Sequence, residues 1–210
     1  QDHKAREAGD RGPNTGGMGA VASRVLIDKD LLSLIDREVM KASVDGLVSD
    51  GMDFRGFLYA GLMLTDEGPK LLEYNCRFGD PEAQAVLPLV GGDFSSYLFE
   101  AAKGNLQQDL ISFDESWSIC LVLASAGYPD SSRNDDLING LDSVEGVRVY
   151  HAGTKKNEDG QYVTNGGRVL AVVGRGDDRE SAVKNSYNEA AKVSFDGNQR
   201  RSDIGRMHFE

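Results

Sequence analysis

The sequence predicts an α+β fold, and three observations support this prediction. Residues 28–50 carry apolar side chains at the spacing of a helix that packs one face on a core. Residues 56–65 and 71–75 have strand composition and flank a tight turn at 66–69, so we expect an antiparallel hairpin. Beyond residue 115, further strand patterns precede a second long helical pattern. Helices set beside turn-connected strands are typical of α+β proteins.

The first half of the chain contains two predicted helices with clear end signals. The helix over 28–50 is followed by Gly51, which suits the left-handed residue that ends a helix. A second helix is expected over 94–103, with Asp93 as its N-cap and Gly104 as its stop. We expect both helices to be structural.

The second half predicts a smaller α+β unit. Strands are expected over 116–124, 147–151 and 168–173. The sequence Asn165-Gly166-Gly167 follows a short apolar stretch and predicts a hairpin-type turn. A final helix is expected over 177–193, with four side chains facing inward: Val183, Tyr187, Ala190 and Ala191.

The pattern changes near residue 105, and we therefore divide the chain into domains 1–107 and 108–210. The chain opens at Gln1 in a charged run without a leading strand or helix, so we expect a fragment of a longer protein. This run does not have the pattern of a signal peptide, so we expect none at the start of the sequence.

Composition excludes several classes of function. A net charge of −11 argues against nucleic acid as a partner, and no apolar run approaches the roughly 20 residues that span a bilayer. The three histidines lack metal-ligand spacing, so a zinc site is not expected. The two cysteines, Cys76 and Cys120, form no disulfide framework and are expected to be reduced, with Cys76 packed inside. We expect a cytoplasmic protein of 210 residues with no membrane partner.

The stretch from Leu71 to Glu82 concentrates the chemistry of the chain. Alternate side chains of a strand share a face, so Glu73 and Asn75 lie on the same face, about 7 Å apart along the strand. Their oxygens can both reach one Mg²⁺ ion. Arg77 follows the strand, where its guanidinium can grip a phosphate or carboxylate. The alternative is a solvated polar strand end followed by a Gly-Asp-Pro turn.

A glycine-rich segment near the start is the second candidate. Residues 12–19 hold several glycines, which allow backbone N–H groups to face an anion without obstruction by Cβ atoms. Asp2 and Lys4 share a face if this part is extended. The alternatives are an ordinary loop and a solvated ion pair. Gly61, inside the first hairpin strand, indicates a close approach to the face that carries Glu73.

Seven short segments occur together in one order along the chain: QDHK, GPNTGGMGA, GFLYAGLM, EYNCRFGDPE, HAGT, TNGGRVL and SDIG. With these segments the chain resembles the glycinamide ribonucleotide synthetase family, also called phosphoribosylamine–glycine ligases, of the ATP-grasp superfamily. The resemblance covers essentially the whole chain. It implies the second half of an ATP-grasp domain, an antiparallel sheet with flanking helices, followed by a small α+β C-terminal domain.

The resemblance implies a ligase of de novo purine biosynthesis. The family joins glycine to 5-phosphoribosylamine through a glycyl phosphate and releases glycinamide ribonucleotide, ADP and phosphate. ATP is the co-substrate and Mg²⁺ or Mn²⁺ the cofactor. The adenine-covering part would belong to an upstream N-terminal half, so this chain alone is expected to be inactive. The alternative is a non-catalytic module that binds Mg²⁺ or a sugar phosphate.

The resemblance also assigns residues. Glu73 and Asn75 match the family's metal ligands, and Arg77 matches the catalytic arginine beside the transferred phosphoryl group. Ala60 or Gly61 holds the place where many ATP-grasp enzymes have a further acidic ligand. Substrate binding is implied for Asp2, Lys4, Asn14, Thr15, Gly16, Gly17, Met18, Gly19, Asp80, Pro81 and Glu82. The chain departs from the family pattern at Ala5 and Ala83, which puts details of the substrate loop in question.

Overall fold

The computed structural model describes residues 1–206, which divide into two compact units. Unit 1 comprises Gln1–Ser23, Asp80–Leu89 and Glu115–Glu210, with residues 207–210 outside the described part. Unit 2 comprises Arg24–Gly79 and Val90–Asp114. The chain therefore passes from one unit to the other four times. The domain boundary expected between residues 107 and 108 falls within a segment of unit 2, and it stays a prediction.

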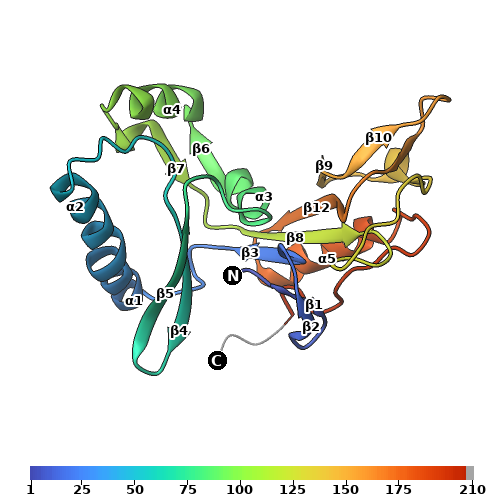
Figure 1. The fold of residues 1–210 in the computed structure, drawn as a ribbon, viewed down its shortest axis with the longest axis horizontal. Helices are drawn as coiled ribbons and strands as arrows, with labels where there is room; N and C mark the ends of the chain where they lie inside the picture. Colours follow the sequence, from blue (N-terminus) through green and yellow to red (C-terminus); the bar gives the residue numbers. More distant parts are fainter. Residues whose placement is uncertain (207–210) are drawn as a thin grey trace. The chain divides into compact units, whose positions relative to one another are not determined.

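A four-stranded antiparallel sheet forms the centre of unit 1 (Figure 1). Its order is β3 (Gly19–Ala22), β8 (Trp117–Ala124), β12 (Arg168–Gly176) and β9 (Arg148–His151). The strands predicted in the second half of the chain are confirmed. Strand β3 was not predicted, because its four small residues follow a glycine-rich segment and give no periodic signal of their own.

Helices cover both faces of this sheet. Ala85 of α3 (Glu82–Val86) packs with Cys120 and Ala171 on one face. Helix α5 (Arg179–Ala190) lies on the other face, where the Ser186 hydroxyl donates a hydrogen bond to the Ile119 carbonyl at 3.0 Å (Figure 1). Since β8 is enclosed from both sides, its sequence from Ile119 to Ala124 is continuously apolar rather than alternating.

Helix α5 begins at a capping box, in which the Asp178 carboxylate accepts from the Ser181 amide at 2.7 Å. It ends three residues before the predicted end at residue 193. Its buried stripe is Ala182, Ser186 and Ala190. Val183 and Tyr187 are half-buried. Ala191, predicted to face inward, is exposed because it lies beside this stripe rather than on it.

Two small hairpins complete the strands of unit 1. Strand β1 (Ala5–Glu7) pairs with β2 (Arg11–Asn14), and β10 (Thr154–Lys156) pairs with β11 (Tyr162–Thr164). The hairpin-type turn predicted at Asn165-Gly166-Gly167 is wrong. That sequence connects β11 to β12, which belong to different sheets. Short 3-10 turns occupy Leu87–Leu89 and Leu141–Ser143.

A buried arginine ties the C-terminal segment to the start of the chain. The Arg201 side chain has no exposed area, and its guanidinium donates to both Asp203 carboxylate oxygens at 2.7–2.8 Å. It also donates to Asp10 Oδ1 at 2.7 Å and to the Ala5 carbonyl at 3.1 Å. The β1–β2 hairpin is thereby held against the chain end by charge-assisted hydrogen bonds.

Unit 2 begins with one long helical run, as predicted for residues 28–50. It consists of α1 (Lys29–Ile35), a π-helical segment (Asp36–Lys41) and α2 (Ala42–Ser49). Asp28 caps it through a 2.7 Å hydrogen bond from the Leu31 amide, and Gly51 follows with a φ of +72°.

The predicted hairpin of unit 2 is also confirmed. Strand β4 (Tyr59–Thr65) pairs antiparallel with β5 (Gly68–Asn75) (Figure 1). Helix α4 (Phe94–Lys103) starts at Asp93 and ends at Gly104, whose φ is +79°. Strands β6 (Val90–Gly92) and β7 (Ile111–Phe113) form a second pair, and a 3-10 turn spans Gln108–Leu110.

Burial differs between the units. Among the described residues, Val39 is the one buried hydrophobic side chain of unit 2, whereas β8 and β12 of unit 1 are buried along most of their length. Cys76, predicted to pack inside, is exposed because β5 ends one residue before it. Within residues 1–206, no helix is both long and apolar enough to cross a bilayer.

Candidate active site

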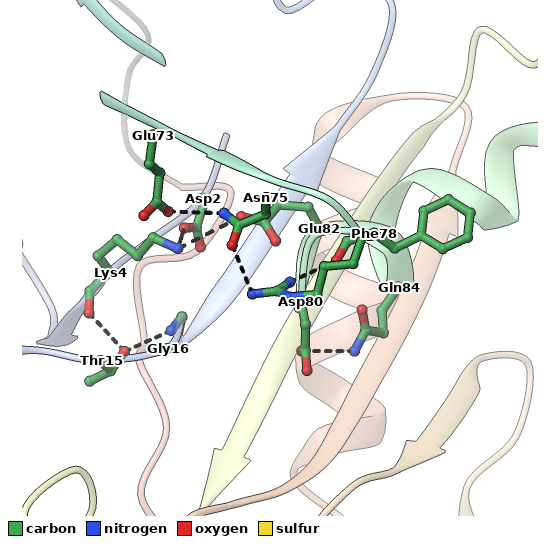
Figure 2. A network of polar contacts seen from close by, with 12 residues as sticks. Asp2, Lys4, Thr15, Gly16, Glu73, Asn75, Phe78, Asp80, Glu82 and Gln84 are labelled. Carbon is green, nitrogen blue, oxygen red and sulfur yellow. Dashed lines mark hydrogen bonds and ion pairs between the residues drawn. The ribbon is translucent and has the colours of Figure 1, made fainter. Parts of the chain in front are cut away.

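The end of strand β5 brings together the two residues predicted to hold a metal. Glu73 pairs with Gly61 and Asn75 with Tyr59 across the hairpin. The Asn75 Nδ2 donates a 3.3 Å hydrogen bond to Glu73 Oε1 (Figure 2). This contact requires both side chains on one side of the strand, so the predicted shared face is confirmed. A register shift lies before Glu73, between the pairs of Gly61 and Leu62, and leaves the alternation from Glu73 to Asn75 intact.

Arg77 extends this row of side chains. Its Nη2 donates to Asn75 Oδ1 at 3.3 Å, and its Nη1 donates to the Phe78 carbonyl at 2.7 Å. The Phe78 ring packs on Phe57 with a centroid distance of 3.7 Å. A carboxylate, an amide oxygen and a guanidinium therefore follow one another at one strand end. Such a row can hold a cation and the phosphate that the cation accompanies.

The donor set fits Mg²⁺. A carboxylate and an amide oxygen are hard ligands, and Mg²⁺ is commonly held by one or two carboxylates together with substrate phosphates. Residues 1–206 contain no cluster of three or more His, Cys, Asp or Glu side chains of the kind that builds a closed protein cage. A Cβ at Gly61 would stand 3.2 Å from Glu73 Cγ, so glycine there gives the Glu73 side chain its space.

Unit 1 carries a charged cluster at the start of the chain. Lys4 Nζ lies 2.6 Å from Asp2 Oδ2 and 3.9 Å from Glu82 Oε1. The Asp2 side chain is only 11% exposed. Burial raises the pKa of Asp2, the nearby Glu82 raises that pKa further, and the Lys4 ammonium opposes both. The cluster thus presents two carboxyl groups and one ammonium group to a polar ligand (Figure 2).

The glycine-rich loop is held by internal hydrogen bonds. The Thr15 amide donates to the Lys4 carbonyl at 2.8 Å, and the Gly17 amide donates to Thr15 Oγ1 at 2.9 Å. The Gly16 amide donates to the Tyr128 hydroxyl at 2.9 Å. The expectation that these amides face an anion is therefore wrong.

The glycines of this loop serve close packing instead. Gly17 has a φ of +119°, and a Cβ there would come within 2.4 Å of Pro81 Cδ. A Cβ at Gly16 would meet the Arg168 guanidinium at 3.1 Å. The loop thus lies directly against the Asp80-Pro81 segment, and both segments are among those predicted to bind substrate.

The remaining predicted site residues differ in exposure. Met18 is 1% exposed and packs with Val122 and Ala124, so its side chain belongs to the core. Gly19 is buried at the start of β3, whereas Asn14 is exposed at the end of β2. Gly17 is buried as well, so contacts of this segment with a ligand would come from residues 14–16.

Sequence reasoning missed two residues that hold these segments. Arg168 Nη1 donates to the carbonyls of Gly16 and Asp80, each at 2.9 Å, and lies 3.1 Å from Asp80 Oδ1. Asp80 Oδ1 also accepts from Gln84 Nε2 at 3.0 Å (Figure 2). Tyr128, the second missed residue, binds the Gly16 amide. Both lie more than 100 positions from Gly16 in the sequence, and no local pattern marks such partners.

Comparisons with known proteins identify the family of the chain. The model of the phosphoribosylglycinamide synthetase ATP-grasp (A) domain matches residues 1–83, and the model of the C domain of the same enzyme matches residues 118–207. The chain belongs to the phosphoribosylglycinamide synthetase family. The family resemblance noted in the sequence is thereby confirmed.

Individual members of the phosphoribosylglycinamide synthetase family extend over nearly the whole chain. A phosphoribosylamine–glycine ligase of Caldanaerobacter subterraneus is 44% identical over 203 residues, which are 97% of this chain and 48% of that protein. The crystal structure of the Thermotoga maritima phosphoribosylamine–glycine ligase is 37% identical and superposes with a TM-score of 0.86 over 97% of this chain and 50% of that one.

The ATP-grasp fold is confirmed by more distant structures as well. The biotin carboxylase domain of the Hydrogenobacter thermophilus 2-oxoglutarate carboxylase is 14% identical, covers 95% of this chain and 42% of that one, and has a TM-score of 0.61. At this identity the likeness concerns the fold alone. The chain spans about half the length of the bacterial synthetases that it matches.

Proposed function

We propose that this chain is the C-terminal part of an ATP-dependent ligase that joins glycine to 5-phosphoribosylamine. The products are glycinamide ribonucleotide, ADP and phosphate, as in the second step of de novo purine biosynthesis. The observation that carries this proposal is the row Glu73, Asn75 and Arg77 at the end of β5, in a chain of the phosphoribosylglycinamide synthetase family. The protein would act in the cytoplasm together with an upstream N-terminal half that completes the ATP site.

We propose that Glu73 and Asn75 hold Mg²⁺, or Mn²⁺ in its place, when ATP is bound. The cation would neutralise charge on the transferred phosphate. Arg77 would stand beside that phosphate and stabilise the negative charge that develops during transfer to the glycine carboxylate. The amine of phosphoribosylamine would then attack the carbonyl of the glycyl phosphate, and phosphate would leave.

Unit 1 would supply the substrate contacts. Asp2, Lys4 and Glu82 form a partly buried charged cluster that suits an amine or carboxylate. We assign the substrate role to this cluster, to residues 14–16 and to residues 80–82, with Gly17, Met18 and Gly19 as structural anchors of the loop. We also propose that residues 1–107 complete the ATP-grasp domain and that residues 108–210 form the small C-terminal domain.

The test is ADP release that requires both glycine and phosphoribosylamine. It is measured for this chain alone and for the chain joined to the upstream half of its gene. Activity is expected only in the joined protein. In that protein, Glu73→Gln should lower kcat by about 100-fold or more, because it removes a charged metal ligand. Glu67→Gln is the matched control, since Glu67 lies on the turn of the same hairpin and pairs with Lys70.

Two results would contradict the proposal. Full activity of the Glu73→Gln protein would remove the metal assignment. Absence of activity in the joined protein, with both forms folded, would favour the non-catalytic alternative, a module that binds Mg²⁺ or a sugar phosphate.

A further inference from the structure

The strongest unassigned feature of unit 1 is the set of contacts around one peptide unit, that of Gly16. Its amide donates to the Tyr128 hydroxyl at 2.9 Å, and its carbonyl accepts from Arg168 Nη1 at 2.9 Å. Gly16 is thus fixed on both sides by side chains that follow β8 or begin β12.

Arg168 also holds a second segment. The same Nη1 donates to the Asp80 carbonyl at 2.9 Å and lies 3.1 Å from Asp80 Oδ1. Its side chain is 23% exposed, so these bonds are partly shielded from water. One guanidinium nitrogen therefore fixes the spacing between the glycine loop and the segment that leads into α3.

The neighbouring packing makes this spacing precise. The Tyr128 ring packs against Met18, Val122 and Ala124. A Cβ at Gly167 would come within 2.4 Å of the Tyr128 ring, so the ring lies directly on the glycine before Arg168. Tyr128 and Arg168 are thereby held to each other through Gly167, and to the sheet because Arg168 begins β12 and the Tyr128 ring packs on side chains of β8.

We propose that Arg168 and Tyr128 are positioning residues for the substrate-binding segments at residues 14–16 and 80–82. This inference rests on the function proposed above for those segments. Both residues act through the protein backbone rather than through the reacting atoms. Displacement of a positioning group by about 1 Å can lower a rate by on the order of 100-fold, so a clamp of this kind has catalytic consequences.

The first experiment measures the clamp without any assay of activity. Amide hydrogen exchange of Gly16 and Gly17 is recorded by NMR on the 210-residue chain for wild type, Tyr128→Phe and Arg168→Lys. We expect exchange of these two amides to accelerate about tenfold in both variants, while amides in the centre of β12 keep their rates. Arg148→Lys, at an exposed arginine of β9, is the matched control.

The second experiment measures the consequence for catalysis. In the chain joined to its upstream half, both variants should raise KM for glycine or phosphoribosylamine by about tenfold and leave KM for ATP within about twofold. A general loss of structure would instead change the KM values for glycine, phosphoribosylamine and ATP alike. It would also lower the melting temperature of the protein.

The outcomes separate the two proposals. An inactive wild-type protein refutes the proposed ligase, whereas the exchange measurement still decides whether the clamp exists. An active wild type with unchanged loop exchange in both variants, or with equal changes in every KM, overturns the positioning role of Arg168 and Tyr128.

Discussion

The two units of this chain differ in how far they bury their apolar side chains. Unit 1 encloses a four-stranded sheet between helices, and residues such as Leu123, Val169 and Val172 have no exposed area. Unit 2 has a hairpin and helices, but its apolar side chains stay largely exposed, as at Leu72 (63%) and Val48 (70%). The predicted metal ligands lie in unit 2, whereas the predicted substrate cluster lies in unit 1.

This contrast indicates where the stability of the chain resides. Burial of apolar surface is the main favourable term in folding, so unit 1 should contribute most of it. The residues proposed to do the chemistry in unit 2 lie on the β4–β5 hairpin, none of whose apolar side chains is buried.

The largest expected effect compares two leucines. Leu123→Ala should lower the free energy of unfolding by about 3–5 kcal/mol, since it opens a cavity between β8 and α5, whereas Leu72→Ala should change it by about 0.5 kcal/mol or less. Chemical denaturation followed by far-ultraviolet circular dichroism measures both, because this signal reports on the helices and strands of either unit. If both variants lose a similar amount of unfolding free energy, the two units do not differ in how much burial stabilises them.

The next effect concerns the buried arginine of unit 1. Arg201→Met should lower the free energy of unfolding by about 2–4 kcal/mol, because it leaves the Asp203 carboxylate without its bidentate partner in a partly buried place. The exposed Arg37→Met, in the helical run of unit 2, serves as the control and should have little effect, since Arg37 pairs only with its neighbour Glu38 among the contacts described. If Arg201→Met leaves the free energy of unfolding unchanged, packing alone holds this C-terminal segment.

A smaller, pH-dependent effect is expected at His3. Burial, followed by the nearby Arg201 charge and the N-terminal amine, lowers the pKa of His3 to about 4, while Asp10 and Asp203 oppose this shift. Between pH 6.5 and about 4, the unfolded chain therefore binds a proton that the folded chain does not. Stability should fall through this range by roughly 1–3 kcal/mol as acid is added.

The His3→Phe variant tests that expectation, because its ring cannot take up a proton. Tryptophan fluorescence across the same pH range should show a flatter loss of stability for the variant than for wild type. Parallel curves would mean that other groups cause the acid sensitivity of unit 1.

The smallest expected effects lie at two helix caps, one in each unit. Asp178→Ala removes the cap of α5 and Asp93→Ala that of α4, and each should cost about 1 kcal/mol. The lower free energy of unfolding of Asp178→Ala should be visible by fluorescence of Trp117, which lies in unit 1. Asp93→Ala should instead only accelerate amide exchange at the start of α4. An Asp93→Ala effect on tryptophan unfolding would show that the units unfold together.

Sequence reasoning succeeded where the signal is local. The helical run at 28–50, the hairpin and the shared face of Glu73 and Asn75 follow from periodicity and turn composition over a few residues. The end of β5 was harder to place, and Cys76 was misassigned because it lies one residue beyond that end.

The same reasoning failed where a partner is distant in the sequence. Strand β3 joins the sheet through β8, about 100 residues away, and Arg168 meets Gly16 across 152 positions. The glycine loop was expected to offer free amides to a ligand, yet distant or neighbouring oxygens of the protein accept them. Composition shows that such a loop permits close approach, and the tertiary structure decides what approaches.

The pairing of β3 with β8 has a consequence for synthesis on the ribosome. Residues 19–22 leave the ribosome long before residues 118–121, with which they pair. At about 5–20 residues per second, β3 waits on the order of 5–20 s for its neighbour, whereas the β4–β5 hairpin closes as soon as it emerges. The chain can thus complete the exposed hairpin of unit 2 before it can complete the buried sheet of unit 1.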